Sequence, residues 1–136
     1  EGMLNLVGEG FMNPANPELL AYVKEFKAKY PEADMSQARI TNAVPMIAKA
    51  IEKAGSATDM VKIAYALEGM EHYNDLLKTK VVMRTKDHQA IQNMHVGIHT
   101  KDVEIDFDNS GYGIKGYKTV EMASMDSPTT CKMKRP

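Results

Sequence analysis

The chain has 136 residues, of which 43% are hydrophobic and 26% charged, and its 17 basic and 18 acidic side chains give a net charge of −1. This length and composition fit one globular domain, and the balanced charge gives no broad field that would favour nucleic acid or an anionic membrane as a partner. No apolar run approaches the roughly 20 residues that span a bilayer, and the one cysteine, Cys131, excludes an internal disulfide.

The first two predicted elements are a strand and a helix. Residues 1–11 are expected to be extended, because the short apolar run at Met3–Val7 is bounded by glycines. A helix is expected over Asn13–Tyr30. Asn16 is a suitable N-cap, and Pro17 occupies the first helical position, where its missing amide donor costs nothing.

The most strongly periodic stretch predicts a helix over Asp34–Ala54. Asp34 can cap its first turn, and Gln37 completes a capping box. Pro45 removes an amide donor, so a kink or a broken hydrogen-bond ladder is expected near residues 41–44. The face expected to be apolar consists of Ala38, Ala43, Met46, Ile47, Ala50, Ile51 and Ala54.

A second helix is expected to run from a cap at Thr58 to Glu68. Asp59 and Lys62 form a pair on its solvent side, worth only a few tenths of a kcal/mol. The short connector between this helix and the preceding one predicts an αα-hairpin. The side chains expected to point inward are Met60, Ile63, Ala64 and Leu67.

The hydrophobic period then changes to that of strands. Lys80–Met83 is a short apolar run, and Gln92–Thr100 alternates between apolar and polar or small residues. Between them, Arg84 and Asp87 flank a polar turn that their side chains can hold by hydrogen bonds. The fold class is therefore α/β, with helices packed on short strands. The remaining segments are a loop at Asp102–Lys115, a last strand at Tyr117–Met122 and a tail at Ala123–Pro136.

Three segments carry a resemblance to a known family: AVPMIAKAIEKAG, SATDMVKIAYALEGM and VVMRTKDHQ. Together with the tail PTTCKMKRP, they resemble the C-terminal third of the type I periplasmic solute-binding proteins of ABC importers, in the branch for branched-chain amino acids. The resemblance runs from Glu1 to Pro136. It implies that the chain is a single C-terminal fragment that spans parts of both lobes of a periplasmic-binding-protein-like fold.

The resemblance also implies a function. Such proteins close two lobes around a small molecule, such as a branched-chain amino acid, in the periplasm, and the closed form docks on an ABC permease. Most ligand contacts in the family come from segments outside this chain, so the isolated chain is expected to bind such ligands weakly or not at all.

The candidate ligand-binding residues are Arg39, Thr41 and Asn42. They lie beside Pro45, where a loosened turn leaves backbone carbonyls free to meet a ligand together with the side chains. Many members of the resembled family have a cleft-lining aromatic residue where this chain has Thr41. The alternative is that Arg39 and Asn42 lie on the solvent face of the helix.

Two clusters contain residue types that bind metals, but neither is predicted to be a metal site. His95 and His99 could share a zinc ion on a helix, with His88 and Asp87 nearby, but on the expected strand they lie about 13 Å apart. The second cluster has carboxylates at positions 1 and 3 of a calcium loop, but its twelfth position is a tyrosine, so a polar turn is the better interpretation. Its residues are Asp106, Asp108, Ser110 and Gly111. No metal or other cofactor is expected.

Enzyme activity is not expected, because Cys131 has no nearby histidine in the sequence and no glycine-rich phosphate loop follows a strand. The competing class is a small α/β interaction module that associates with a second copy of itself. Unpaired strand edges at Met3–Val7 and Val81–Met83 would favour such a homodimer.

Overall fold

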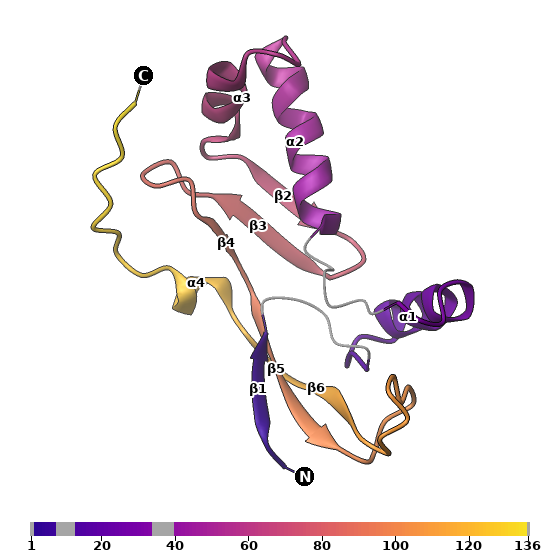
Figure 1. The fold of residues 1–136 in the computed structure, drawn as a ribbon. Helices are drawn as coiled ribbons and strands as arrows, with labels where there is room; N and C mark the ends of the chain where they lie inside the picture. Colours follow the sequence, from indigo (N-terminus) through magenta and orange to yellow (C-terminus); the bar gives the residue numbers. More distant parts are fainter. Residues whose placement is uncertain (1, 8–12, 34–39, 136) are drawn as a thin grey trace.

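The computed structural model describes residues 2–7, 13–33 and 40–135. Within them the chain forms two halves, each built on a three-stranded antiparallel sheet (Figure 1). The elements are β1 (Leu4–Val7), α1 (Pro17–Lys29), α2 (Ile40–Ala54), α3 (Met60–Leu67), β2 (Glu71–Asn74), β3 (Thr79–Met83), β4 (Ala90–Gln92), β5 (Met94–Thr100), β6 (Gly113–Val120) and α4 (Met122–Met125).

The first half contains the sheet β1-β5-β6 together with α1. β5 lies in the middle and pairs with β1, with Leu4 opposite Ile98, and with β6 on its other side. β1 is therefore hydrogen-bonded to a strand along one side and is an edge strand of this sheet, which agrees with the unpaired edge expected at Met3–Val7. The partner is β5, some 90 residues further along the chain. β6 begins at Gly113 rather than at Tyr117, because its early residues pair with the far end of β5.

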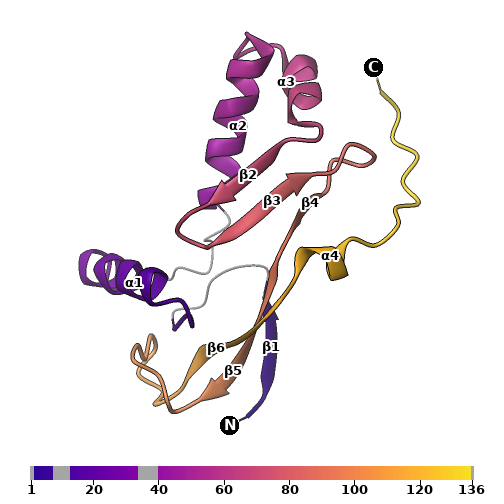
Figure 2. The same ribbon diagram turned by 180° about the vertical axis from the view of Figure 1, so that it is seen from behind.

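The second half contains the sheet β2-β3-β4, with α2 and α3 beside it in both views (Figures 1 and 2). β3 confirms the predicted strand at Lys80–Met83, but it lies between β2 and β4 and is paired on both sides. The expected free edge at Val81–Met83 is therefore wrong, and this strand gives no support to a homodimer formed by strand exchange. β2 was not predicted from the sequence.

Helix α1 follows the sequence prediction closely. It starts at Pro17, and the Asn16 side chain accepts from the backbone amides of Glu18 and Leu19 at 2.9 and 3.3 Å. These bonds satisfy amides that the first turn cannot pair.

Helix α2 is continuous from Ile40 to Ala54 and includes Pro45, which has no amide hydrogen to donate, so the expected gap in the hydrogen-bond ladder does not end the helix. The predicted caps at Asp34 and Gln37 lie outside the described residues. The buried side is rotated from the one expected, since it contains Asn42, Met46 and Ala50. An apolar stripe is left at the surface on this helix: Ile40, Val44 and Ile47.

Helix α3 begins at Met60, one residue later than a cap at Thr58 would set it. The Asp59 side chain is the cap and accepts from the Lys62 amide at 3.1 Å, which lowers the pKa of Asp59. Met60, which was expected to point inward, is 63% exposed, whereas Ala66 is buried. The α2–α3 hairpin is held by a core cluster of Ala50, Ile63 and Ala66.

Two connections between the halves lie wholly within the described residues. One is Asn93, which separates β4 from β5, so the single strand expected at Gln92–Thr100 is divided between the two sheets. The other is Glu121, which separates β6 from α4, and α4 packs on β4. Asn93 Oδ1 accepts from the backbone amide of Met122 at 2.8 Å and so fastens the two connections together.

No helix in the described ranges is both long and apolar enough to cross a membrane.

Candidate functional site

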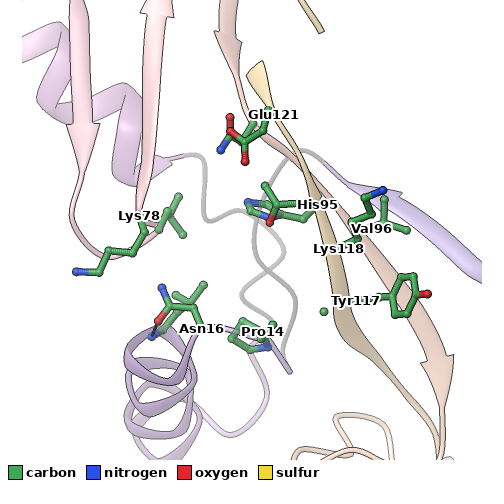
Figure 3. A pocket seen from close by; sticks show the side chains of 14 residues that line it. Pro14, Asn16, Lys78, His95, Val96, Tyr117, Lys118 and Glu121 are labelled. Atoms are coloured by element: carbon green, nitrogen blue, oxygen red, sulfur yellow. Dashed lines mark hydrogen bonds between the residues drawn. The ribbon is translucent and has the colours of Figure 1, made fainter. Parts of the chain in front are cut away.

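A cavity of about 330 Å³ lies where the two halves meet (Figure 3). The first half contributes the lead-in to α1 and the neighbouring strands β5 and β6, and the second half contributes the β2–β3 turn. Both connections border the cavity, at Asn93 and at Glu121. The polar groups around it are Asn16, Lys78, Asn93, His95, Lys118, Thr119 and Glu121. A molecule in this cavity would therefore contact both halves and the segments about which they could bend.

One wall of the cavity is a direct contact between the halves. Leu77, in the β2–β3 turn, is only 6% exposed and packs in one core cluster with Leu19 and Val23 of α1. Around it, Asn16 Nδ2 donates to the Leu76 carbonyl at 3.3 Å.

An ion pair lies at the edge of the same contact. Lys78 Nζ is 2.8 Å from Glu18 Oε2, and this hydrogen bond raises the pKa of Lys78. Both side chains are largely exposed, so the pair adds little to the stability of the contact. Lys78 adopts a φ of 50°, in the left-handed region, as tight turns often require.

The start of α2 holds two of the three predicted ligand-binding residues. Asn42 is 4% exposed and lies inside the protein. Its Nδ2 donates to Gln92 Oε1 of β4 at 3.1 Å, and its Oδ1 accepts from Asn74 Nδ2 at 2.6 Å. The solvent-face alternative is therefore wrong for Asn42. Arg39 lies outside the described residues.

Asn74, at the end of β2, joins the start of α2 to the turn. Its Nδ2 also donates to Thr41 Oγ1 at 2.9 Å, and its Oδ1 accepts from the amides of Leu76 and Leu77 at 3.0 and 2.9 Å. Sequence reasoning missed Asn74. The pair Asn74-Asp75 was a usable turn signal, because asparagine side chains commonly bond the backbone two residues on.

The structure thus brings Thr41 and Asn42 to the cavity only indirectly. Neither lines it, but both connect through Asn74 to Leu77, which does. Both the nitrogen and the oxygen of the Asn42 side-chain amide are hydrogen-bonded to other side chains of the protein. Asn42 therefore connects α2 to β4 and β2.

The histidines of the rejected zinc site lie against different partners. His95 contacts Thr119 at 3.2 Å, His99 stacks on the Tyr112 ring at 5.1 Å between centroids, and His88 contacts Glu68 at 2.8 Å. In residues 2–7, 13–33 and 40–135, no three His, Cys, Asp or Glu side chains are grouped to hold a metal ion.

The rejected calcium loop is a turn whose carboxylates accept from backbone amides. Asp106 accepts from Ser110 at 3.1 Å and from Gly111 at 2.8 Å, and Asp108 accepts from Ser110 at 3.2 Å. The hydrogen bonds from Ser110 lower the pKa of Asp108.

The polar turn between β3 and β4 is held as predicted. Arg84 forms two hydrogen bonds with Asp87, Nε to Oδ1 at 2.9 Å and Nη2 to Oδ2 at 2.6 Å, and these hold the pKa of Asp87 far below its usual range. Arg84 also donates to the Ser127 carbonyl at 2.7 Å. Beyond it, Arg135 bonds Glu68 and the Thr85 carbonyl, so the turn also anchors the C-terminal tail.

The described residues thus form two halves with two connections fastened to each other and a cavity where the halves meet. The family profile described as periplasmic binding protein matches residues 2–101. The chain therefore belongs to the periplasmic binding protein family.

Solved structures of this family share the fold. A leucine-, isoleucine-, valine-, threonine- and alanine-binding protein from Brucella ovis, in a closed conformation, matches all of this chain with a TM-score of 0.78 and 22% identity. An ABC-type branched-chain amino acid transporter from Rhodopseudomonas palustris matches 97% of the chain, with a TM-score of 0.68 and 26% identity.

A third similar structure is a solute-binding protein of an ABC transporter from Rhodopseudomonas palustris in complex with p-hydroxybenzoic acid. It matches 89% of the chain with a TM-score of 0.62 and 19% identity. The chain spans only 36%, 34% and 31% of these three proteins. No curated protein sequence gives a significant match.

Proposed function

We propose that this chain is the C-terminal portion of the substrate-binding component of an ABC importer. In this proposal the protein is not an enzyme: it binds a small molecule in the periplasm and presents it to a membrane permease. The observation that carries the proposal is the cavity between two halves joined by short connections, in a chain of the periplasmic binding protein family. This is the geometry from which hinge closure on a ligand follows.

The proposed ligand is a small carboxylic acid, with branched-chain amino acids as the first candidates and aromatic acids as the second. Two similar solved structures are named for branched-chain or related amino acids, and the third contains an aromatic acid. Within this chain we assign the ligand-binding role to Arg39, Thr41 and Asn42. Arg39 and Thr41 would face the ligand, and Asn42, whose amide is bonded to Gln92 and Asn74, would hold the first turn of α2 in place beside it. Arg39 would supply the positive charge for a carboxylate, since arginine matches its two oxygens.

The proposal is tested by calorimetric titration of L-leucine and of p-hydroxybenzoate into two samples. One is the 136-residue chain, and the other is the polypeptide that contains it in its source, identified by intact mass. We expect the longer polypeptide to bind one of the two ligands and the 136-residue chain to bind weakly or not at all. Failure of the longer polypeptide to bind any amino acid or aromatic acid would overturn the function.

Two further results would correct parts of the proposal. Micromolar binding by the 136-residue chain would refute the view that its own residues make too few ligand contacts. An intact mass near 15.1 kDa in the source would refute the view that the chain is a portion of a longer protein.

A further inference from the structure

We infer that the β2–β3 turn, residues 75–78, is a latch that holds the two halves together, and that Asn74 is the positioning residue that sets this latch from the first turn of α2. The inference deepens the proposed function and rests on it, because a latch matters only if the halves open and close. The inference names the residues that hold the two halves together. It also states how the first turn of α2, beside the proposed ligand site, is connected to those residues.

The latch is an apolar side chain of one half inserted into the other. Leu77 belongs to the second half by its place between β2 and β3, yet it is buried against Leu19 and Val23 of α1. Separating the halves would expose this cluster to water. Removing a buried leucine side chain typically costs about 2–5 kcal/mol, so this contact is large enough to decide whether the halves stay together.

Helix α1 is firmly fixed to the first half, so Leu77 does bridge the two. Asn13 Nδ2 donates to the Ile105 carbonyl at 2.9 Å, and Asn13 Oδ1 accepts from the amides of Glu104 and Ile105 at 2.9 and 2.8 Å. The Asn13 carbonyl accepts from the Gly116 amide of β6 at 2.8 Å. Lys24 and Glu104 form an ion pair further along the helix.

The turn is equally fixed to the second half, through one side chain. Asn74 is 5% exposed, and its carbonyl oxygen accepts from the amides of Leu76 and Leu77, which sets the direction in which Leu77 points. Its amide nitrogen donates to Thr41 and Asn42 in the first turn of α2. A shift of that turn is therefore transmitted to the latch through a buried hydrogen-bonded side chain.

The latch is tested without any ligand, by the distance between spin labels on the two halves. The labels replace Tyr22 of α1 and Glu52 of α2, both exposed, in a Cys131→Ser background. We expect one short distance in the parent protein. In Leu77→Ala a second, longer distance should appear, with the open-to-closed ratio raised about 30-fold or more. A distance distribution identical to that of the parent would overturn the latch.

Leu67→Ala is the matched control, because Leu67 packs in the core cluster of the α2–α3 hairpin, inside one half. It removes the same atoms and should lower stability while leaving the distance between the halves unchanged. A lengthened distance in this control would also overturn the inference, since it would show that general destabilisation separates the halves.

The role of Asn74 is tested by two substitutions in the same labelled protein. Asn74→Ala removes the acceptor for the turn and should open the halves as Leu77→Ala does. Asn74→Asp keeps that acceptor but loses the donor to Thr41 and Asn42 and places a carboxylate against Asn42 Oδ1, so it should open the halves as well. A closed Asn74→Ala protein, or a closed Asn74→Asp protein, would refute the positioning role. Because no ligand is present, these results stand apart from the titration, so a working latch in a protein that binds no tested acid would count only against the proposed function.

Discussion

Gly116→Ala is the sharpest test of how the first half is assembled. A Cβ atom at this position of β6 would lie 2.7 Å from the backbone nitrogen of Ala15 and 3.4 Å from the Ala15 Cβ and the Pro14 carbonyl carbon. The closest atom belongs to the backbone, so no side-chain rotation can relieve the clash. Either β6 or the segment leading into α1 must move.

The magnitude follows from that movement. Overpacking of a tight contact costs about 1–3 kcal/mol, and moving the segment also strains the hydrogen bond from the Gly116 amide to the Asn13 carbonyl, worth about 0.5–1.5 kcal/mol. The loss of chain entropy in the unfolded state returns about 0.4–1 kcal/mol. The net expectation is a loss of about 1–3 kcal/mol in the free energy of unfolding.

Urea unfolding followed by circular dichroism measures this loss. Gly113→Ala in the same strand is the control, because its Cβ would meet side-chain atoms of Val103 and Asn13 at 3.0 to 3.3 Å, and side chains can adjust. We expect a smaller loss there. The close contact between Gly116 and the Ala15 backbone would be refuted by a Gly116→Ala protein with the same urea midpoint as the parent. It would also be refuted if Gly113→Ala were less stable than Gly116→Ala.

Three other predictions concern the site and the turns. Asn74→Ala leaves two amides of the β2–β3 turn without their acceptor and should lower the free energy of unfolding by about 2–4 kcal/mol, measured by urea unfolding; an unchanged midpoint would show that the turn holds itself. Thr41→Tyr should raise the affinity of the longer polypeptide for p-hydroxybenzoate, measured by calorimetry, if this position faces the ligand; unchanged affinity would remove Thr41 from the proposed site. Because Arg84 depresses the pKa of Asp87, the stability contributed by this pair is present above pH ~4 and is lost as the pH falls below it. The difference in unfolding midpoint between the parent and Asp87→Asn should therefore be largest at pH 7 and shrink at pH 2, and a difference that grew on acidification would contradict that cause.

The sequence predicted local structure well where the signals were local. Asn16 and Pro17 fixed the start of α1, and the pairing of Arg84 with Asp87 across a turn was evident from their types and spacing. The start of α3 was misplaced because Asp59 and Thr58 are both good caps and the sequence does not rank them by geometry.

What the sequence could not give was pairing between distant segments. β2 was missed because Glu71–Asn74 contains little apolar alternation, and it is a strand only because β3 pairs with it. β1 pairs with a strand some 90 residues further along the chain, and β3, which was expected to have a free edge, lies between β2 and β4. The candidate site shows the same limit: Asn42 was identified, but Asn74 lies 32 residues away from it, and only the fold brings the two amides together.

The bond between Asn93 and Met122 has a mechanical consequence. A single strand between two bodies allows rotation about almost any axis. Two strands fastened side by side resist twisting, and they leave one easy motion, a bend about the line that runs through both. The two halves should therefore move about one fixed axis. Each closure should then bring the same side chains of the two halves into contact.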